Sequence, residues 1–386
     1  MDLSFSEEQQ VLRENVRRYF REQFHKNGQQ QKPSDRSRER WAAFAEMGWL
    51  GVLLPEDVGG SDGSVIDVAI ILEEFGRNLA TEPYLACAVL SARVISRAAF
   101  TEQRNALLAS MVRGELMVTL AHTEAAARGD VAFVETSAER NAGGEYALSG
   151  RKPLVLGGSM ADKFAVSARL DCGNGGHGGI AVFIVNRDAP GMSLREYSTI
   201  DGRSAADLTL ENVVVGQDAL LIPAEHGLAA IEEATDFAIT GLCAEAIGAM
   251  DKVIKVTAEY LKTRRAYGST LNKFQALQHR VADMLIELEL SRSMLYYAFA
   301  AFSETSPEDR KRAVSSAKAL IGRSAKFVAA NGIQLHGAQG MADDYLIGQH
   351  FKQMTVLEAL FGNSDFHWER CARCAVRCGD GPIAEH

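Results

Sequence analysis

The residues that favour β-strands constrain this chain most, because they are confined to one block between two helical stretches. Between about residues 115 and 225, short runs of β-branched and aromatic residues are separated by glycine-rich turns. On both sides of this block, apolar residues recur at helical spacing over long segments. Strands and helices do not alternate, and no G-x-G-x-x-G stands at a strand–helix junction, which excludes a Rossmann dinucleotide fold. The pattern predicts a mostly helical α+β protein.

The predicted organisation has three domains that follow these changes of pattern. Residues 1–114 form an all-α domain, residues 115–225 a β domain and residues 226–386 a second helical domain. A chain of 386 residues is long enough for two or three compact units. In the first domain, Ser6 and Gln9 make a capping box before a helix.

The middle domain is predicted to be a compact β barrel or sandwich, because its strands are short and regularly spaced. A glycine-rich stretch at residues 173–179 is not followed by a helix or by Lys-Ser/Thr, so it is interpreted as a hairpin loop rather than a phosphate loop. The predicted strands are residues 117–121, 131–138, 146–148, 164–168, 180–185, 193–197 and 208–215.

The last domain is predicted to hold a shorter helix near residues 368–377, which carries three of the six cysteines. The spacing of Cys371, Cys374 and Cys378 fits three metal-binding thiolates or one packed helix face. A zinc knuckle needs a turn between its cysteines, and no Gly or Pro separates Cys371 from Cys374, so the helix face is preferred and no metal is predicted. The long helices of this domain are predicted at residues 229–265, 274–304, 308–331 and 342–360.

Charge and hydropathy restrict the partners and the compartment that we expect. The formal net charge is −9 and no basic stripe is present, so neither nucleic acid nor an anionic membrane is an expected partner. The N-terminus lacks the basic and apolar regions of a secretory signal, and no apolar run approaches the roughly 20 residues of a membrane-spanning helix. The cysteines do not have the spacing of a secreted disulfide framework. A cytoplasmic protein is expected.

Five segments, in this order, resemble signature motifs of the acyl-CoA dehydrogenase superfamily, and together they cover essentially the whole chain. They are MGWLGVLLPE at residues 47–56, EEFGR at 73–77, TE and GD at 123–124 and 129–130, RRAYG with FQ at 264–268 and 274–275, and QLHGAQG at 334–340. The resemblance implies an all-α domain, a β domain and a C-terminal four-helix bundle, assembled as a tetramer. It also implies FAD between the domains, with its ADP half reaching a neighbouring subunit.

The resemblance also implies which residues contact FAD. A pyrophosphate needs a guanidinium and close backbone N–H donors, so Arg264 is expected to carry the positive charge. Glycine has no side chain that would block the backbone, so the glycines at 337 and 340 are expected to let it approach the dinucleotide. The expected contacts are Thr123, Leu156, Arg264, Tyr267, Gln275, Gln334, Gly337 and Gly340.

The reaction that the resemblance implies is α,β-dehydrogenation of an acyl-CoA thioester, in which a carboxylate removes the α proton and flavin N5 accepts a hydride. Both positions that carry this base in the family are non-ionisable here, since they hold Phe361 and Ala238. Leu154 replaces the aromatic wall of the flavin, Leu156 the hydroxyl that bonds N5, and Gly129 a serine of the flavin loop. The chain therefore lacks the usual catalytic side chains.

Other ionisable residues near these positions are not expected to substitute for the base. Asp236 and Glu358 lie two or three residues away on their helices, which turns their side chains by about 200–300°. Asp365 reaches the position only if the loop differs from the family. Three histidines that resemble catalytic groups are interpreted as loop or helix-end residues: His122, His336 and His367.

The retained and lost residues lead to one hypothesis and two alternatives. The chain resembles small subunits of bacterial heteromeric acyl-CoA dehydrogenases, of the pimeloyl-CoA dehydrogenase type, which implies a Glu-bearing large subunit as partner. A self-sufficient homotetrameric enzyme with an atypical base is the first alternative, and a non-catalytic scaffold is the second. By family analogy, an electron-transfer flavoprotein is the expected electron acceptor.

Overall fold

The computed structural model of the protein describes residues 5–25, 37–170, 179–303 and 306–377. The chain divides into two compact units. The first unit comprises Met1–Gln30, Val65–Ala80 and Ile239–His386, and the second comprises Gln31–Ser64 and Thr81–Ala238. The division falls within helix α6 (Ala224–Thr263).

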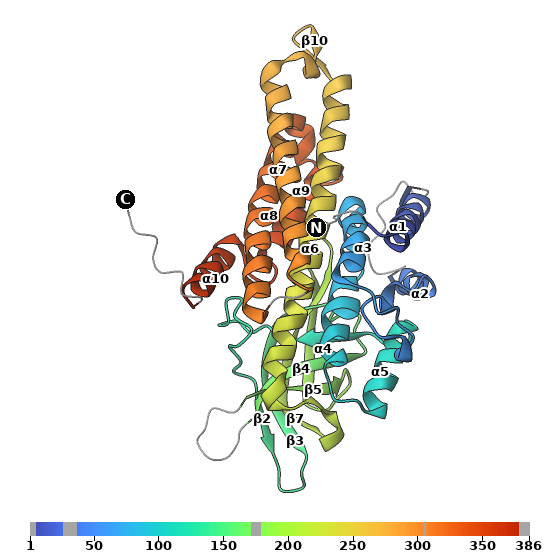
Figure 1. Cartoon of the computed structure of the whole chain (residues 1–386), viewed down its shortest axis with the longest axis vertical. Coiled ribbons are helices and arrows are strands. Elements are labelled where there is room, and N and C mark those ends of the chain that lie inside the picture. Colours follow the sequence, from blue (N-terminus) through green and yellow to red (C-terminus); the bar gives the residue numbers. More distant parts are fainter. Residues whose placement is uncertain (1–4, 26–36, 171–178, 304–305, 378–386) are drawn as a thin grey trace. The chain divides into compact units, whose positions relative to one another are not determined.

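The first unit is built mainly from helices (Figure 1). Its amphipathic first helix begins at the capping box, where the Gln9 N–H donates to Ser6 Oγ and the Ser6 N–H donates to Gln9 Oε1, both over 3.2 Å. The four long helices predicted for the C-terminal part are confirmed, with ends shifted by a few residues. The helices are α1 (Glu7–His25), α3 (Val65–Asn78), α6 from Ile239, α7 (Gln275–Ala300), α8 (Pro307–His336), α9 (Leu346–Ala359) and α10 (Ser364–Arg377).

Helices α3 and α6 approach each other closely because each places a glycine at their crossing. A Cβ added to Gly76 would lie 1.8 Å from the Glu245 carbonyl oxygen, and one added to Gly248 would lie 1.8 Å from the Glu73 carbonyl oxygen. Any side chain at either position would collide with backbone. The two glycines therefore fix how near the N-terminal helix α3 lies to the C-terminal part of the unit.

The second unit combines short helices with the β domain. Its helices include α2 (Ser37–Glu46), α4 (Ala92–Ser96) and α5 (Glu102–Val112), and a buried π-helical segment, η3 (Leu85–Ser91), leads directly into α4. The Ser91 hydroxyl donates to the Ala86 carbonyl five residues earlier over 2.6 Å, which satisfies a carbonyl inside the widened turn. Residues 224–238 of α6 complete this unit.

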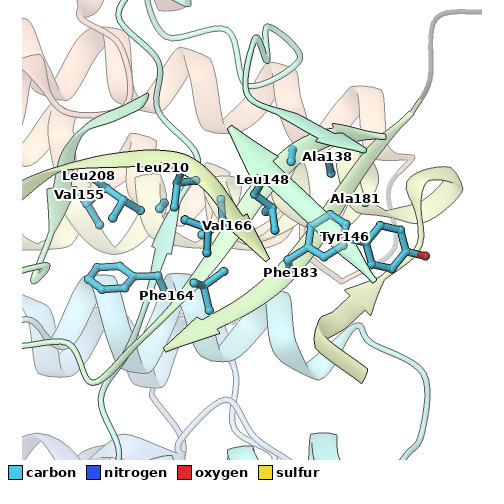
Figure 2. Packing of buried hydrophobic residues seen from close by; sticks show 14 of the residues in the cluster. Ala138, Tyr146, Leu148, Val155, Phe164, Val166, Ala181, Phe183, Leu208 and Leu210 are labelled. Atoms are coloured by element: carbon cyan, nitrogen blue, oxygen red, sulfur yellow. The ribbon is translucent and has the colours of Figure 1, made fainter. Parts of the chain in front are cut away.

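One eight-stranded sheet forms the β domain, with the order β6-β7-β3-β2-β4-β5-β8 and β1 paired to β4. The sequence did not distinguish a β barrel from a β sandwich. In the structure, hydrogen bonds join all these strands into a single sheet. Apolar side chains such as Leu148, Phe164 and Phe183 lie between its crossing strands (Figure 2). The strands are β1 (Val118–Ala121), β2 (Ser137–Arg140), β3 (Tyr146–Leu156), β4 (Lys163–Leu170), β5 (Ile180–Asn186), β6 (Met192–Ser198), β7 (Ser204–Val215) and β8 (Leu220–Ile222).

Two details of the strand prediction are wrong. The strand expected over residues 131–138 begins only at Ser137, because the Glu135 and Thr136 N–H groups donate to the Glu124 carboxylate instead of a neighbouring strand. The strand expected over residues 146–148 continues to Leu156 through two irregular pairings with β7. The hairpin loop predicted between β4 and β5 lies largely outside the described residues, although the two strands are antiparallel neighbours.

Two further findings concern membranes and metals. Among the described residues, no helix has the length and apolar character needed to cross a membrane. In the same part of the chain, no three His, Cys, Asp or Glu side chains are placed to hold a metal ion. Cys371 and Cys374 lie on α10 as predicted, and Cys378 lies outside the described residues.

Candidate functional site

The flavin-side residues expected in the β domain follow strand β1 and the end of strand β3. Thr123 comes two residues after β1 and is partly buried, while the next residue, Glu124, turns its carboxylate into the domain. Leu156 is the last residue of β3, and its carbonyl accepts a hydrogen bond of 2.6 Å from Thr119 Oγ1 on β1. The two expected contacts thus come from neighbouring segments of one domain.

A buried ion pair joins these two segments. The Lys152 ammonium, which is fully buried, lies 2.6 Å from Glu124 Oε1 and 3.0 Å from Ser167 Oγ. Glu124 also accepts hydrogen bonds from the Glu135 N–H and from the Thr136 N–H and hydroxyl, at 2.7, 3.0 and 2.8 Å. Because every oxygen of the carboxylate has a donor, the charge is well satisfied despite its burial.

Burial and mutual attraction act in opposite directions on this pair. Burial lowers the pKa of Lys152 to about 8, although the Glu124 carboxylate opposes that change. Burial alone would raise the pKa of Glu124, but the Lys152 ammonium and the hydrogen-bond donors outweigh it, so the pKa is lowered. At neutral pH both groups are charged. The sequence did not indicate this pair, because Lys152 and Glu124 lie 28 residues apart.

Leu154, which the resemblance places at the aromatic wall of the flavin, has an unusual backbone conformation. Its φ is +52°, a conformation that residues with a Cβ rarely adopt, and it sits at the irregularity between Lys152 and Val155. The Leu154 N–H donates to Asp207 Oδ1 over 3.1 Å, which holds this bulge in place. Neither Leu154 nor Leu156 carries a side-chain hydrogen-bond donor.

In the first unit, the expected ADP contacts gather at the ends of α6, α7 and α8. Arg264 follows α6 directly, and the hairpin of β9 (Arg265–Ala266) and β10 (Ser269–Thr270) then leads towards Gln275 at the start of α7 (Figure 1). Tyr267, at the turn of this hairpin, has a φ of +52° and is 93% exposed. The guanidinium and the amide are also exposed, and neither has a side-chain hydrogen-bond partner among the described residues.

The end of α8 lies beside the end of α6. Tyr260 stacks on His336 with 4.3 Å between the ring centroids, and its hydroxyl lies 3.5 Å from the His336 carbonyl oxygen. Gln334, in the last turn of α8, is exposed, and Gly337 ends the helix with a φ of +62°. A Cβ added to Gly340 would lie 2.9 Å from the Ile333 carbonyl oxygen, so this turn has no room for a side chain.

These exposed residues fit the diphosphate half of FAD. An uncommitted guanidinium, two amides and a glycine turn are the groups that bind pyrophosphate and adjacent ribose. His336 Nε2 is buried and has no hydrogen-bond partner in the described part of the chain. The flavin-ring half fits less well, because the β domain offers leucine side chains at the two positions described above.

The two positions at which the resemblance places the base hold apolar side chains, one buried and one partly buried. Ala238 is completely buried in α6. Phe361 follows α9 in a turn where its φ is +57° and that of Gly362 is +96°. The His367 ring lies 3.0 Å from the Phe361 carbonyl oxygen through Nε2, and Nδ1 lies 3.2 Å from Ser315 Oγ.

A buried lysine that the sequence did not indicate stabilises the turn that follows α9. Lys318 Nζ donates to the Leu357 and Glu358 carbonyls over 2.6 and 2.9 Å, at the end of α9. Burial lowers the pKa of Lys318 to about 8. Its partners are backbone carbonyls about 40 residues later in the chain, so no local sequence signal could reveal them.

The alternative carboxylates are accounted for by other roles or positions. Glu358 accepts hydrogen bonds from the Ser364 N–H and the Lys326 ammonium, at 3.1 and 3.0 Å. Asp236 is completely buried, and Asp365 is exposed in the first turn of α10. The expectation that Glu358 does not serve as the base stays a prediction.

The three histidines are buried, which suits structural roles. Burial lowers the pKa of His122 to about 4 and that of His367 to about 3, and it also lowers the pKa of His336. An imidazole that stays neutral throughout the physiological range is a poor general acid–base catalyst.

Comparison with known families gives three consecutive matches. The acyl-CoA dehydrogenase N-terminal domain matches residues 6–115, the middle domain residues 119–213 and the C-terminal domain residues 225–375.

Individual relatives match over nearly the full length. Acryloyl-CoA reductase (NADH) of Anaerotignum propionicum is 27% identical over 376 residues, which cover 95% of this chain and 94% of that protein. A structure described as the electron transferring flavoprotein of Acidaminococcus fermentans superposes with a TM-score of 0.86 at 26% identity, covering 98% of this chain and 100% of that one. A structure described as a Tcur3481-Tcur3483 steroid ACAD variant superposes with a TM-score of 0.85 at 28% identity, covering 97% of this chain and 99% of that one.

Proposed function

Because the chain belongs to the acyl-CoA dehydrogenase family, we propose that it is the base-lacking subunit of a heteromeric acyl-CoA dehydrogenase. The family consists of oxidoreductases that act on the CH–CH group of acyl-CoA thioesters, and its cofactor is FAD. In the proposed assembly, this chain contributes residues to the FAD of a Glu-bearing partner subunit.

A contrast between two groups of residues carries the proposal. Phe361 and Ala238 cannot accept a proton, and Leu156 cannot donate a hydrogen bond from its side chain. The diphosphate-side residues, by contrast, are intact, exposed and uncommitted, as shown by Arg264 and Gln334. A subunit that serves only a neighbour's cofactor requires the second group and can dispense with the first.

The role of this chain's own residues is then binding and positioning. When FAD is bound, its flavin ring supplies the hydride acceptor of the dehydrogenation. Arg264 neutralises the pyrophosphate and Gln275 and Gln334 donate amide hydrogen bonds, while the Gly337–Gly340 turn leaves space for the dinucleotide. The proton acceptor for the α proton comes from the partner.

Two further features support an assembly of this kind. Helix α7 exposes four large apolar residues, each 47–56% accessible, and such exposure is typical of an interface: Leu285, Ile286, Leu290 and Tyr297. The similar steroid ACAD is described by two protein names, Tcur3481 and Tcur3483, and we propose an assembly of two different chains for this protein as well. An electron-transfer flavoprotein is the proposed electron acceptor, since such a protein is named for a similar structure.

The first experiment is the visible absorption spectrum of the chain purified alone. We expect a colourless protein that becomes yellow only when it is co-purified with a Glu-bearing family member encoded by the same host. A yellow protein with about one FAD per chain that is bleached anaerobically by acyl-CoA would instead establish the self-sufficient enzyme.

A pair of arginine variants separates the proposal from a non-catalytic scaffold. Arg264→Gln is expected to reduce the FAD content of the purified assembly by about tenfold or more, since it removes a charge-assisted contact to the pyrophosphate. Arg265→Gln is the matched control, because this exposed neighbour lies in β9 and has no assigned contact. Equal FAD content in both variants would favour the scaffold.

A further inference from the structure

The first unit contains a pocket that no residue of the proposed FAD site lines. It has a volume of about 410 Å³ and lies among α1, α3, α6 and α7. This volume falls within the roughly 300–1,000 Å³ that is usual for small-molecule sites. Its location, formed wholly by residues of one unit, makes it independent of the proposed function.

Positive side chains outnumber negative ones around this pocket. Five cationic residues line it, against two carboxylates, Glu73 and Asp251, so the lining carries a formal excess of three positive charges (5 − 2 = 3). Glu74 and Glu289 lie outside the lining but pair with Arg17, Arg77 and Arg292, so the whole cluster keeps one excess positive charge (5 − 4 = 1) and favours an anion. The cationic residues are Arg13, Arg17, Arg77, Lys255 and Arg292.

Most of these cations compete for one carboxylate. Asp251, which is 6% exposed, accepts from Arg77, from Lys255 at 2.8 Å and from Arg292 at 3.5 Å. Its two oxygens cannot satisfy all the donors of two guanidinium groups and one ammonium group. Arg77 is also held by Glu73 and Glu74, and Arg292 is also held by Glu289, so these guanidinium groups are already committed to carboxylates.

Arg13 is the cation least committed to the protein. Among the described residues it makes no ion pair, and its guanidinium lies 5.5 Å from the centroid of the Phe5 ring. Its neighbour one turn along α1, Arg17, is held by Glu74 at 2.9 Å. Arg13 can therefore bind an anion without breaking an existing ion pair.

The excess charge also affects the lysines of α6. The pKa of Lys255 is lowered by burial first, and then by the nearby Arg77, Arg17 and Arg292 guanidinium groups. The pKa of Lys252 is lowered by burial and by Arg77 and Lys255 in the same way. A bound anion would relieve this repulsion.

The remaining part of the lining is apolar. It comes from three helices, and several of its members are almost completely buried: Ala69, Ile70, Ile247, Leu295 and Phe299. A small inorganic ion would contact only the charged part of this lining. A ligand that satisfies the whole lining combines an acidic head with an apolar body.

We propose that this pocket binds an organic anion with an apolar body, such as a free medium-chain fatty carboxylate or an alkyl phosphate, with Arg13 contacting the anionic head. The carboxylate and the phosphate share the required chemistry, and binding measurements distinguish them.

The test is isothermal titration calorimetry of the full chain with sodium octanoate, octyl phosphate, 1-octanol and inorganic phosphate. We expect octanoate or octyl phosphate to bind at least tenfold more tightly than octanol or inorganic phosphate. Arg13→Gln should weaken this binding by roughly 10- to 100-fold, because it removes a charge-assisted contact. Arg18→Gln is the matched control, since this exposed arginine of the same helix does not line the pocket.

Several results would overturn the proposal. They are an absence of binding up to 10 mM (a limit of about 3 kcal/mol), equal affinity for octanol and octanoate, or equal effects of the Arg13 and Arg18 substitutions. Binding of octanoate in an acyl-CoA site elsewhere in the chain would also appear as equal affinity in both variants. A second variant, Ile66→Trp, should likewise abolish binding because the indole would occupy the pocket.

Discussion

The buried ion pair between Lys152 and Glu124 makes a demanding prediction about stability. Replacing Lys152 by Met keeps most of the side-chain volume but removes the ammonium that lies 2.6 Å from the carboxylate. The Glu124 side chain is only 3% exposed, so water cannot replace the lost donor. The carboxylate would then be buried with three donors in place of four.

The expected loss follows from that change. Removing one member of a buried ion pair typically costs about 3–5 kcal/mol, because the other charge is left uncompensated. The donors from Glu135 and Thr136 stay in place, so we expect the lower end, about 3 kcal/mol. Changing both members, as Lys152→Met with Glu124→Leu, removes the stranded charge and should be less destabilising than the sum of the two single changes.

Thermal unfolding followed by calorimetry measures this loss, with Arg151→Met as the matched control. Arg151 precedes Lys152 in β3 but is exposed, so its replacement should leave the melting temperature nearly unchanged. The reasoning is refuted if Lys152→Met lowers the melting temperature no more than Arg151→Met, or if the double variant shows simple additivity.

Two further predictions concern acid and helix packing. Burial lowers the pKa of His122 and His350 to about 4 and that of His367 to about 3, so the unfolded chain binds more protons than the folded one below the ordinary pKa near 6.5. The stabilisation that the neutral histidines contribute is therefore complete above about pH 6.5. As the pH decreases, the free energy of unfolding falls by about 2 kcal/mol per histidine at pH 5. A melting temperature that is flat between pH 7 and 5 would contradict this. Gly248→Ala should destabilise the protein by at least about 2 kcal/mol, since its Cβ would collide with the Glu73 carbonyl, and an unchanged denaturation midpoint would rule out the close crossing of α3 and α6.

Local sequence patterns predicted most of the fold, because the helices and caps depend on residues that are close together in the sequence. The capping box at Ser6 and the long helices follow from residues three or four positions apart. The strand that begins at Tyr146 was predicted to end at Leu148, whereas it continues to Leu156 past Pro153, a residue that is unfavourable in a strand interior. The structure places this proline at an irregular pairing, where a missing N–H is tolerated. Strand β8 is only three residues long and was missed.

Sequence motifs indicated the expected residues of the candidate site, whereas residues whose partners are distant in the sequence were missed. The expected ADP-side residues lie together at the ends of three helices, and their roles stay predictions. Two buried lysines, Lys152 and Lys318, stabilise segments next to the expected site residues, and their partners lie tens of residues away in the sequence. The three domain boundaries also stay predictions of the sequence.

The interleaving of the two units has a consequence for synthesis of the chain. Arg77 and its partner Asp251 are 174 residues apart, so the N-terminal helix leaves the ribosome long before its binding surface exists. At about 5–20 residues per second, the delay is roughly 9–35 s. During that interval α1 is available to pack on α3, as Phe20 does on Phe75, but the side of α3 that crosses α6 at Gly248 has no native surface to cover it. The first unit can complete its folding only after the C-terminal helices have emerged, so nascent chains of this protein need protection from aggregation until then.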